Sequence, residues 1–184
     1  MNMNKEIKKI IIASSCIAIA IVFAQIVHIV GGQPLGKLIS PMHIPVFIGG
    51  MILGWKYGLL VGVLTPLVSY LFRGIPPIVP TGLGMCLELG AYGFISGLMS
   101  EKVKFSNKSL INIYLSLIIG MIGGRILYGL YCTIYFPLNS IPWSFKLFVT
   151  SLFVEPIIGI IIQIYSIPFV VYGIKKSGIL NIYN

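Results

Sequence analysis

The sequence predicts an all-α, polytopic membrane bundle of about six transmembrane helices, with the N- and C-termini both in the cytoplasm. Its 184 residues are 57% hydrophobic and only 9% charged, and the mean hydropathy is +1.00. Soluble domains carry about 25% charged residues, so a surface this poor in charge must face lipid. A helix needs about 20 apolar residues to span a bilayer core, so we expect 1–184 to form a single membrane-embedded domain.

The first helix is predicted over 9–30. Its apolar run ends at Gly31, Gly32 and Pro34, which break helices. Lysines before the run also fit a cleaved secretory signal. The run is longer than a typical signal core, and no clean small-residue cleavage site follows it. We therefore interpret it as a retained transmembrane helix.

The second and third helices are predicted over 42–55 and 58–72. Trp55, Lys56 and Tyr57 are typical of an interfacial anchor and a turn between them. Both helices are shorter than a straight span needs, which leaves a five- or seven-span count open.

The last three helices are predicted over 82–99, 110–135 and 145–172. The link at 101–108 is the most polar segment of the chain, and Pro137 and nearby residues end the fifth helix.

The basic residues set the orientation, because cytoplasmic loops carry an excess of Lys and Arg. With the N-terminus inside, nine lysines are cytoplasmic, and Lys37, Arg73 and Lys146 are outside. The basic residues flank apolar runs, so the net charge of +9 does not indicate a nucleic-acid partner. The three cysteines are far apart in apolar runs and show neither a disulfide framework nor metal-ligand spacing, so no metal site is expected.

Three ionisable residues lie inside predicted helices, where a charge usually faces a cavity or an opposite charge. From a rise of about 1.5 Å per residue, Glu88 lies about 9 Å from the outer end of its helix, and Arg125 and Glu155 lie about 15 Å from theirs. These depths predict a pocket that opens to the outside. The alternative is a buried Arg–Glu pair that locks the helices at 110–135 and 145–172 together. The local charge, minus one with both glutamates ionised, favours a neutral or cationic ligand.

Five further residues are candidates for the pocket. Tyr92 shares a helix face with Glu88, and Tyr128 shares one with Arg125. Aromatic rings beside polar groups are typical of small-molecule sites, although Tyr is also common at membrane interfaces. His43 is a candidate ligand contact or an interfacial residue. Asn139 and Trp143, in the outer link, are candidates for a lid.

Small residues form two stripes on the first helix. Ser14 and Ala18 lie four residues apart, and so do Ala20 and Ala24. Such stripes let helices approach closely in lipid, so each stripe indicates either internal packing or a docking surface for a partner protein.

The sequence lacks the motifs of several function classes. The chain has no Asp at all and no Walker loop, so we expect it not to hydrolyse ATP. It carries no zinc-protease or serine-hydrolase motif, no voltage-sensor arginine repeat and no obvious inverted repeat. We expect neither an enzyme nor a cofactor.

Four stretches of the sequence resemble the substrate-binding S component of energy-coupling factor (ECF) vitamin transporters. These stretches are SPMHIPVFIGG (40–50), LGWKYG (53–58), GVLTP (62–66) and LELGAYG (87–93). The family's helix 1 signature, Ala-x-x-x-Ala, reads here as Ser14-x-x-x-Ala18, with Ala20-x-x-x-Ala24 further on. The resemblance covers nearly the whole chain.

The resemblance implies a division of labour in the plasma membrane. This chain would capture a vitamin on the outer side, in a pocket near the outer ends of helices 4 to 6. A transmembrane coupling protein and two ATPases would drive its release, and the helix 1 stripe would contact the coupling protein. Glu88 and Glu155 would accept hydrogen bonds from ligand donors, while Arg125 would balance a glutamate or bind a ligand acceptor.

Two alternatives stay open at this point. One is a stand-alone secondary transporter, and the other is a membrane enzyme that uses Glu88, Glu155 and His43 on a lipid or peptide. The identity of the vitamin is also open. The local charge favours a pyridoxine-like or pyrimidine compound, whereas pantothenate would need its carboxylate on Arg125.

Overall fold

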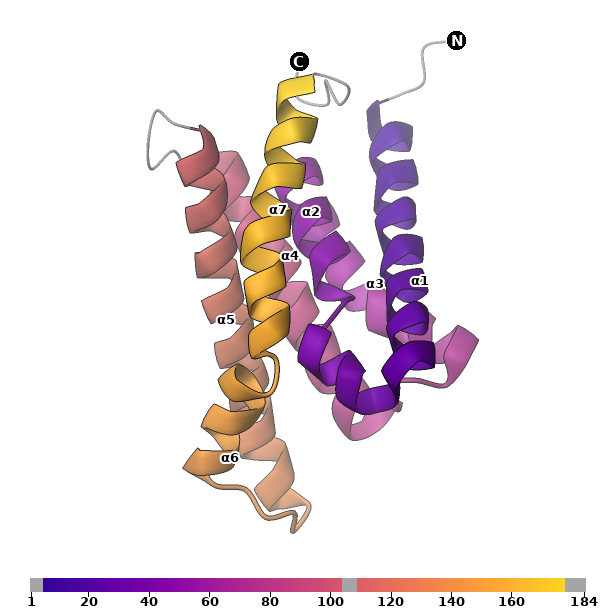
Figure 1. Cartoon of the computed structure of the whole chain (residues 1–184), viewed down its shortest axis with the longest axis vertical. Coiled ribbons are helices and arrows are strands. Elements are labelled where there is room, and N and C mark those ends of the chain that lie inside the picture. The colour runs from indigo at the N-terminus through magenta and orange to yellow at the C-terminus, as the bar shows by residue number, and fades with distance from the viewer. Residues whose placement is uncertain (1–4, 104–108, 178–184) are drawn as a thin grey trace.

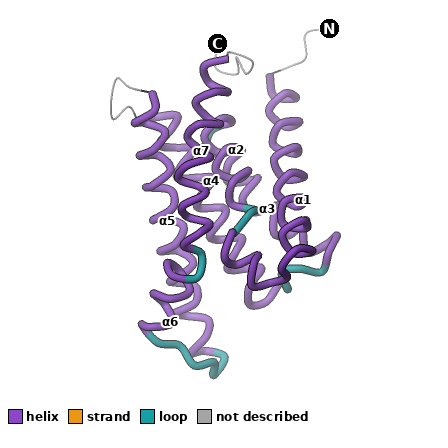
Figure 2. The backbone as a smooth tube through the Cα atoms, in the orientation of Figure 1, coloured by secondary structure: helices purple, strands orange, loops and turns teal. Residues whose placement is uncertain are grey.

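The structure, a computed structural model, describes residues 5–103 and 109–177. All regular structure in these two ranges is helical (Figure 1, Figure 2). Among the described residues, five spans are long and apolar enough to cross a membrane, and a shorter apolar helix, His43–Leu53, completes the predicted six. The elements are α1 (Lys5–Ile39), α2 (His43–Leu53), α3 (Trp55–Arg73), η1 (Ile78–Gly82), α4 (Leu83–Lys102), α5 (Ser109–Leu138), α6 (Phe145–Val149), η2 (Thr150–Val154) and α7 (Ile157–Ser177).

The start of α1 and the end of α7 lie at the same end of the bundle (Figure 1). The α1–α2 link, the α3–η1 link and α6 lie at the opposite end, which is the lower end in the figure. We call it the distal end. This arrangement is the one expected for an even number of membrane crossings. The links that the sequence predicted to be extracellular all lie at the distal end.

The first helix is longer than predicted, because it bends instead of ending. Gly31 and Gly32 have non-helical backbone angles, and the helix then continues to Ile39. Gly32 has a φ of 64°, a conformation that only glycine adopts readily. Pro34 follows the bend closely, in the first turn of the resumed helix, where a missing N–H costs little.

The boundary between the second and third helices differs from the prediction. Trp55, Lys56 and Tyr57 form the first turn of α3 and not a turn before it. The reversal of the chain is confined to Gly54, whose φ is 87° and whose N–H donates to the carbonyl of Gly50. A single glycine is enough here because it adopts a positive φ without steric cost.

Helices α3 and α4 pack backbone to backbone. A Cβ added at Gly58 would collide with the Gly93 carbonyl, and a Cβ at Gly62 would collide with the Leu89 carbonyl. Small residues permit this distance, and dispersion contacts at short range replace the hydrophobic force that lipid does not supply. The close pairing fixes α4, which carries Glu88, against the rest of the bundle.

The last span is interrupted, although the sequence predicted a continuous helix over 145–172. It consists of α6 and η2, followed by a turn at Glu155 and Pro156 and then by α7. The N–H of Glu155 donates to the carbonyl of Thr150, five residues earlier, and Pro156 has no N–H to continue the ladder. Glu155 is therefore at a break and is exposed, not in the middle of a helix.

Candidate ligand-binding site

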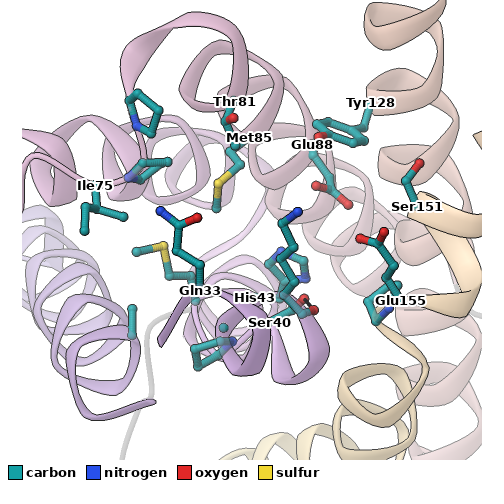
Figure 3. A pocket seen from close by; sticks show the side chains of 18 of the residues that line it. Gln33, Ser40, His43, Ile75, Thr81, Met85, Glu88, Tyr128, Ser151 and Glu155 are labelled. Atoms are coloured by element: carbon teal, nitrogen blue, oxygen red, sulfur yellow. Dashed lines mark hydrogen bonds between the residues drawn. The ribbon is translucent and has the colours of Figure 1, made fainter. Parts of the chain in front are cut away.

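A cavity of about 500 Å³ lies toward the distal end of the bundle. Its walls come from the end of α1, the start of α2, the end of α3, the start of α4, α5 and the η2–α7 junction (Figure 3). The volume is in the range of small-molecule sites, about 300–1,000 Å³. Six of the eight residues that the sequence nominated for the pocket line this cavity: His43, Glu88, Arg125, Tyr128, Trp143 and Glu155.

A buried ion pair joins α4 to α5 beside the cavity. Arg125 NH1 lies 3.5 Å from Glu88 Oε1, and both residues are only 5% exposed. The sequence alternative was an Arg–Glu pair between the fifth and sixth predicted helices. A buried pair exists, but it joins Arg125 to Glu88 of the fourth predicted helix and not to Glu155. Both residues also line the cavity, so the pair is in reach of a ligand.

Tyr92 holds Glu88 in place from outside the cavity. Its hydroxyl donates to Glu88 Oε1 over 2.6 Å, and the residue is fully buried. Its ring stacks on Phe47 at 4.6 Å and meets His43 edge-on at 5.1 Å. Arg125 and Tyr92 therefore contact the same carboxylate oxygen of Glu88, Oε1.

Several buried nitrogen atoms on the cavity wall have no hydrogen-bond partner among the described residues. They are His43 Nδ1, Arg73 Nε and NH1, and Arg125 NH2. Buried polar groups are nearly always paired in folded proteins, and an unpaired one costs about 1–3 kcal/mol. Unpaired groups grouped around one cavity are typical of a site that is completed by a polar ligand.

Glu155 faces the cavity from the side opposite the α4 wall. In Figure 3 its carboxylate and that of Glu88 point into the same space, with Tyr128 and Ser151 close by. Among the described residues Glu155 makes no ion pair. The depth estimate brought these two carboxylates together correctly, although the helix around Glu155 is broken.

Of the two residues proposed as a lid, Asn139 and Trp143, only one lines the cavity. Trp143 lines the cavity and donates through its indole N–H to Thr133 Oγ1 over 3.2 Å. Asn139 does not line it, and its amide donates to the Tyr135 carbonyl at the end of α5.

Sequence reasoning missed two cations of this cavity. Lys37 and Arg73 both line it, although the sequence placed them only as outer-link residues that set orientation. The bend in α1 brings Lys37 over the cavity, and the end of α3 brings Arg73. The signal that could have identified them was their position on the same side as the expected pocket. With them included, the cavity has three cations and two carboxylates, so the expected local charge of minus one was too negative.

The two stripes of α1 face in different directions. Ala20 and Ala24 are buried in the core, with 0% and 8% exposure. Ser14 and Ala18 are exposed on the outer surface of the helix. Internal packing therefore accounts for the second stripe, and the first remains free for a partner.

Within residues 5–103 and 109–177, no group of three His, Cys, Asp or Glu side chains could hold a metal ion.

Comparison with known proteins gives one family and no individual relative. The family described as "ECF transporter, substrate-specific component" matches residues 8–171. No curated protein and no solved structure matches the chain. Since the match covers most of the sequence, this multi-pass membrane protein belongs to the substrate-specific components of ECF transporters, transporter subunits that associate with an ECF module and are not enzymes.

Proposed function

We propose that this chain captures a water-soluble vitamin or related micronutrient from the extracellular side and presents it to an ECF module for ATP-driven uptake. The observation that carries the proposal is the cavity itself. It is large enough for a vitamin, and its wall holds an Arg–Glu pair in which Arg125 NH2 has no hydrogen-bond partner among the described residues. A small-molecule site combines apolar walls with a few such polar groups.

Each polar group has a role in this proposal. Oε2 of Glu88 and the carboxylate of Glu155 accept hydrogen bonds from ligand donors. NH2 of Arg125 donates to a ligand acceptor, and His43 supplies a further polar contact. Tyr128 and Trp143 contribute aromatic surface, while Tyr92 positions Glu88 without touching the ligand.

The orientation of the chain supports capture from outside. The cavity lies at the distal end, away from the start of α1 and the end of α7. The excess of lysines puts the termini in the cytoplasm, so the cavity faces the extracellular solution.

The partners in this proposal are a transmembrane coupling protein and two cytoplasmic ATPases. The outer stripe of α1, Ser14 and Ala18, is the contact with the coupling protein. Small exposed residues allow a partner helix to come close, and the neighbouring side chains of α1 are apolar and exposed as well.

The first test is native mass spectrometry of the gently purified full chain, followed by thermal stabilisation against a panel of vitamins. We expect about one equivalent of a co-purified small molecule, or a panel member that raises the melting temperature. A folded protein that retains no small molecule and responds to no panel member would contradict the proposal.

A further inference from the structure

Arg73 stands out on the cavity wall because it forms no ion pair with any residue that the structure describes. It is the last residue of α3, and its Nε and NH1 atoms are buried without a partner among the described residues. A basic residue at the C-terminal end of a helix commonly serves as an interfacial anchor that interacts with the helix dipole. Such an anchor keeps its nitrogen atoms in water or among headgroups, whereas two of the three nitrogen atoms of the Arg73 side chain are buried in a residue that lines the cavity.

The other charges of the cavity offset one another. Arg125 is paired with Glu88. Lys37 and Glu155 both line the cavity and also a neighbouring hollow beside the α1 bend, so their opposite charges lie in the same region. Arg73 borders only the first of these two spaces, and it leaves the cavity with an excess of one positive charge.

The unpaired arginine nitrogens also fix the kind of partner. An Arg side chain has only donors, so Nε and NH1 of Arg73 and NH2 of Arg125 can be satisfied only by acceptor atoms. The planar guanidinium matches carboxylate and phosphate groups, and hydrogen bonds between such charged partners are stronger than neutral ones. Low polarity around a buried site strengthens them further.

The cavity has two chemically different sides. Figure 3 shows Ile75 and Gln33 on one side and Glu155, Ser151 and Tyr128 on the other, with Met85 between them. Arg73 ends α3, two residues before Ile75, so its backbone belongs to the Ile75 side of the cavity. The carboxylate of Glu155 is at the other side. A ligand that spans the cavity meets a cation at one end and an acceptor at the other.

We propose that the ligand is a small organic anion whose carboxylate or phosphate binds Arg73 and whose hydroxyl or N–H groups face Glu155. This inference rests on the proposed function, because it takes the cavity as the substrate site. It reverses the preference for neutral or cationic ligands that the three helix-embedded charges alone suggested.

Matched pairs of acid and neutral compounds test the proposal on the purified full chain in lipid nanodiscs. The pairs are pantothenate with pantothenol, nicotinate with nicotinamide, and pyridoxal 5′-phosphate with pyridoxal. The first two carry a carboxylate and the third a phosphate, so the pairs distinguish the two anions. Any molecule that co-purifies joins the panel with its own acid or neutral counterpart, and binding is measured by calorimetry.

We expect one acid to bind roughly 10- to 100-fold more tightly than its neutral counterpart, the range for a hydrogen bond between charged groups. Arg73→Gln should shrink this gap, Arg73→Lys should retain part of it, and Lys146→Gln should leave it intact. Lys146 is a matched control, because it is an exposed cation near the same end of the bundle that does not line the cavity.

The outcomes separate the two proposals. If a ligand binds as well without its acidic group, or if Arg73→Gln leaves the gap unchanged, the anion assignment is wrong and capture of a micronutrient stands. If the folded chain binds no panel member and no small molecule co-purifies with it, the proposed function itself is contradicted.

Discussion

Gly58 of α3 and Gly93 of α4 face each other with no side chain between them, and a Cβ on either glycine would collide with the carbonyl oxygen of the other. The α3–α4 pair is thus held by direct backbone contact. Since α3 ends at Arg73 and α4 carries Glu88, this contact sets the distance between two walls of the cavity.

Gly58→Ala should therefore destabilise the protein, although alanine favours helices over glycine by about 1 kcal/mol. Overpacking of a close contact costs about 1–3 kcal/mol, so we expect a lower melting temperature in detergent or nanodiscs. Gly173→Ala is the control, because a Cβ at Gly173 of α7 meets nothing within 4 Å. An equal response of the two variants would show that the α3–α4 contact tolerates a side chain.

Breaking the Glu88–Arg125 pair on one side should cost more than removing it altogether. Arg125→Gln leaves a buried carboxylate with its main partner lost, a change that costs about 3–5 kcal/mol. The double variant Glu88→Gln/Arg125→Gln should recover much of that stability and still lose ligand affinity. Melting temperature and calorimetry on all four proteins of the cycle give the coupling. Full binding by the double variant would mean that the pair is only structural.

Tyr92→Phe should weaken ligand binding without contact to the ligand. It removes the hydrogen bond to Glu88 Oε1 and keeps the stacking on Phe47, so we expect a modest loss of about 0.5–1.5 kcal/mol in stability. The same substitution at Tyr165, an exposed residue of α7, is the matched control. Ligand affinity is measured for both variants. Unchanged affinity in Tyr92→Phe, or an equal loss in Tyr165→Phe, would contradict the positioning role.

Large side chains on the two stripes of α1 should have different effects. Ser14→Trp/Ala18→Trp should abolish uptake in cells that carry the ECF module, while the purified chain still binds its ligand. Ala20→Trp/Ala24→Trp should instead lower the melting temperature, because both positions are buried. Normal transport by Ser14→Trp/Ala18→Trp would contradict the docking role of this stripe.

Uptake should also depend on the ECF module itself. In a host without ECF ATPases, the chain should bind its ligand and transport none. Accumulation of ligand in that host would favour the stand-alone secondary transporter over a capture subunit.

The sequence predicted the helical class because apolar length alone decides it in a membrane. It failed where one or two residues change the backbone path. Gly31 and Gly32 were taken as the end of the first helix, and they bend it instead. Pro156 was not recognised as a break, so Glu155 was expected inside a helix.

The site was predictable only in part, for a related reason. Depth along each helix puts Glu88, Arg125 and Glu155 in the outer half of the bundle, and all three line one cavity. Depth alone places Arg125 level with Glu155, whereas the structure pairs Arg125 with Glu88. Depth says nothing about link residues, because the position of a link depends on how the helices pack. Lys37 and Arg73 were therefore missed as cavity residues.

The bend at Gly31 and Gly32 separates two tasks within one helix. The residues before it include the outward face at Ser14 and Ala18, and those after it pack against α7, where the Ile39 carbonyl approaches Gly159. Glycine dihedrals change without side-chain strain. The part of α1 before the bend can therefore tilt in the bilayer while the part after the bend stays packed at the cavity. A subunit built this way can adjust to its partner without releasing its cargo.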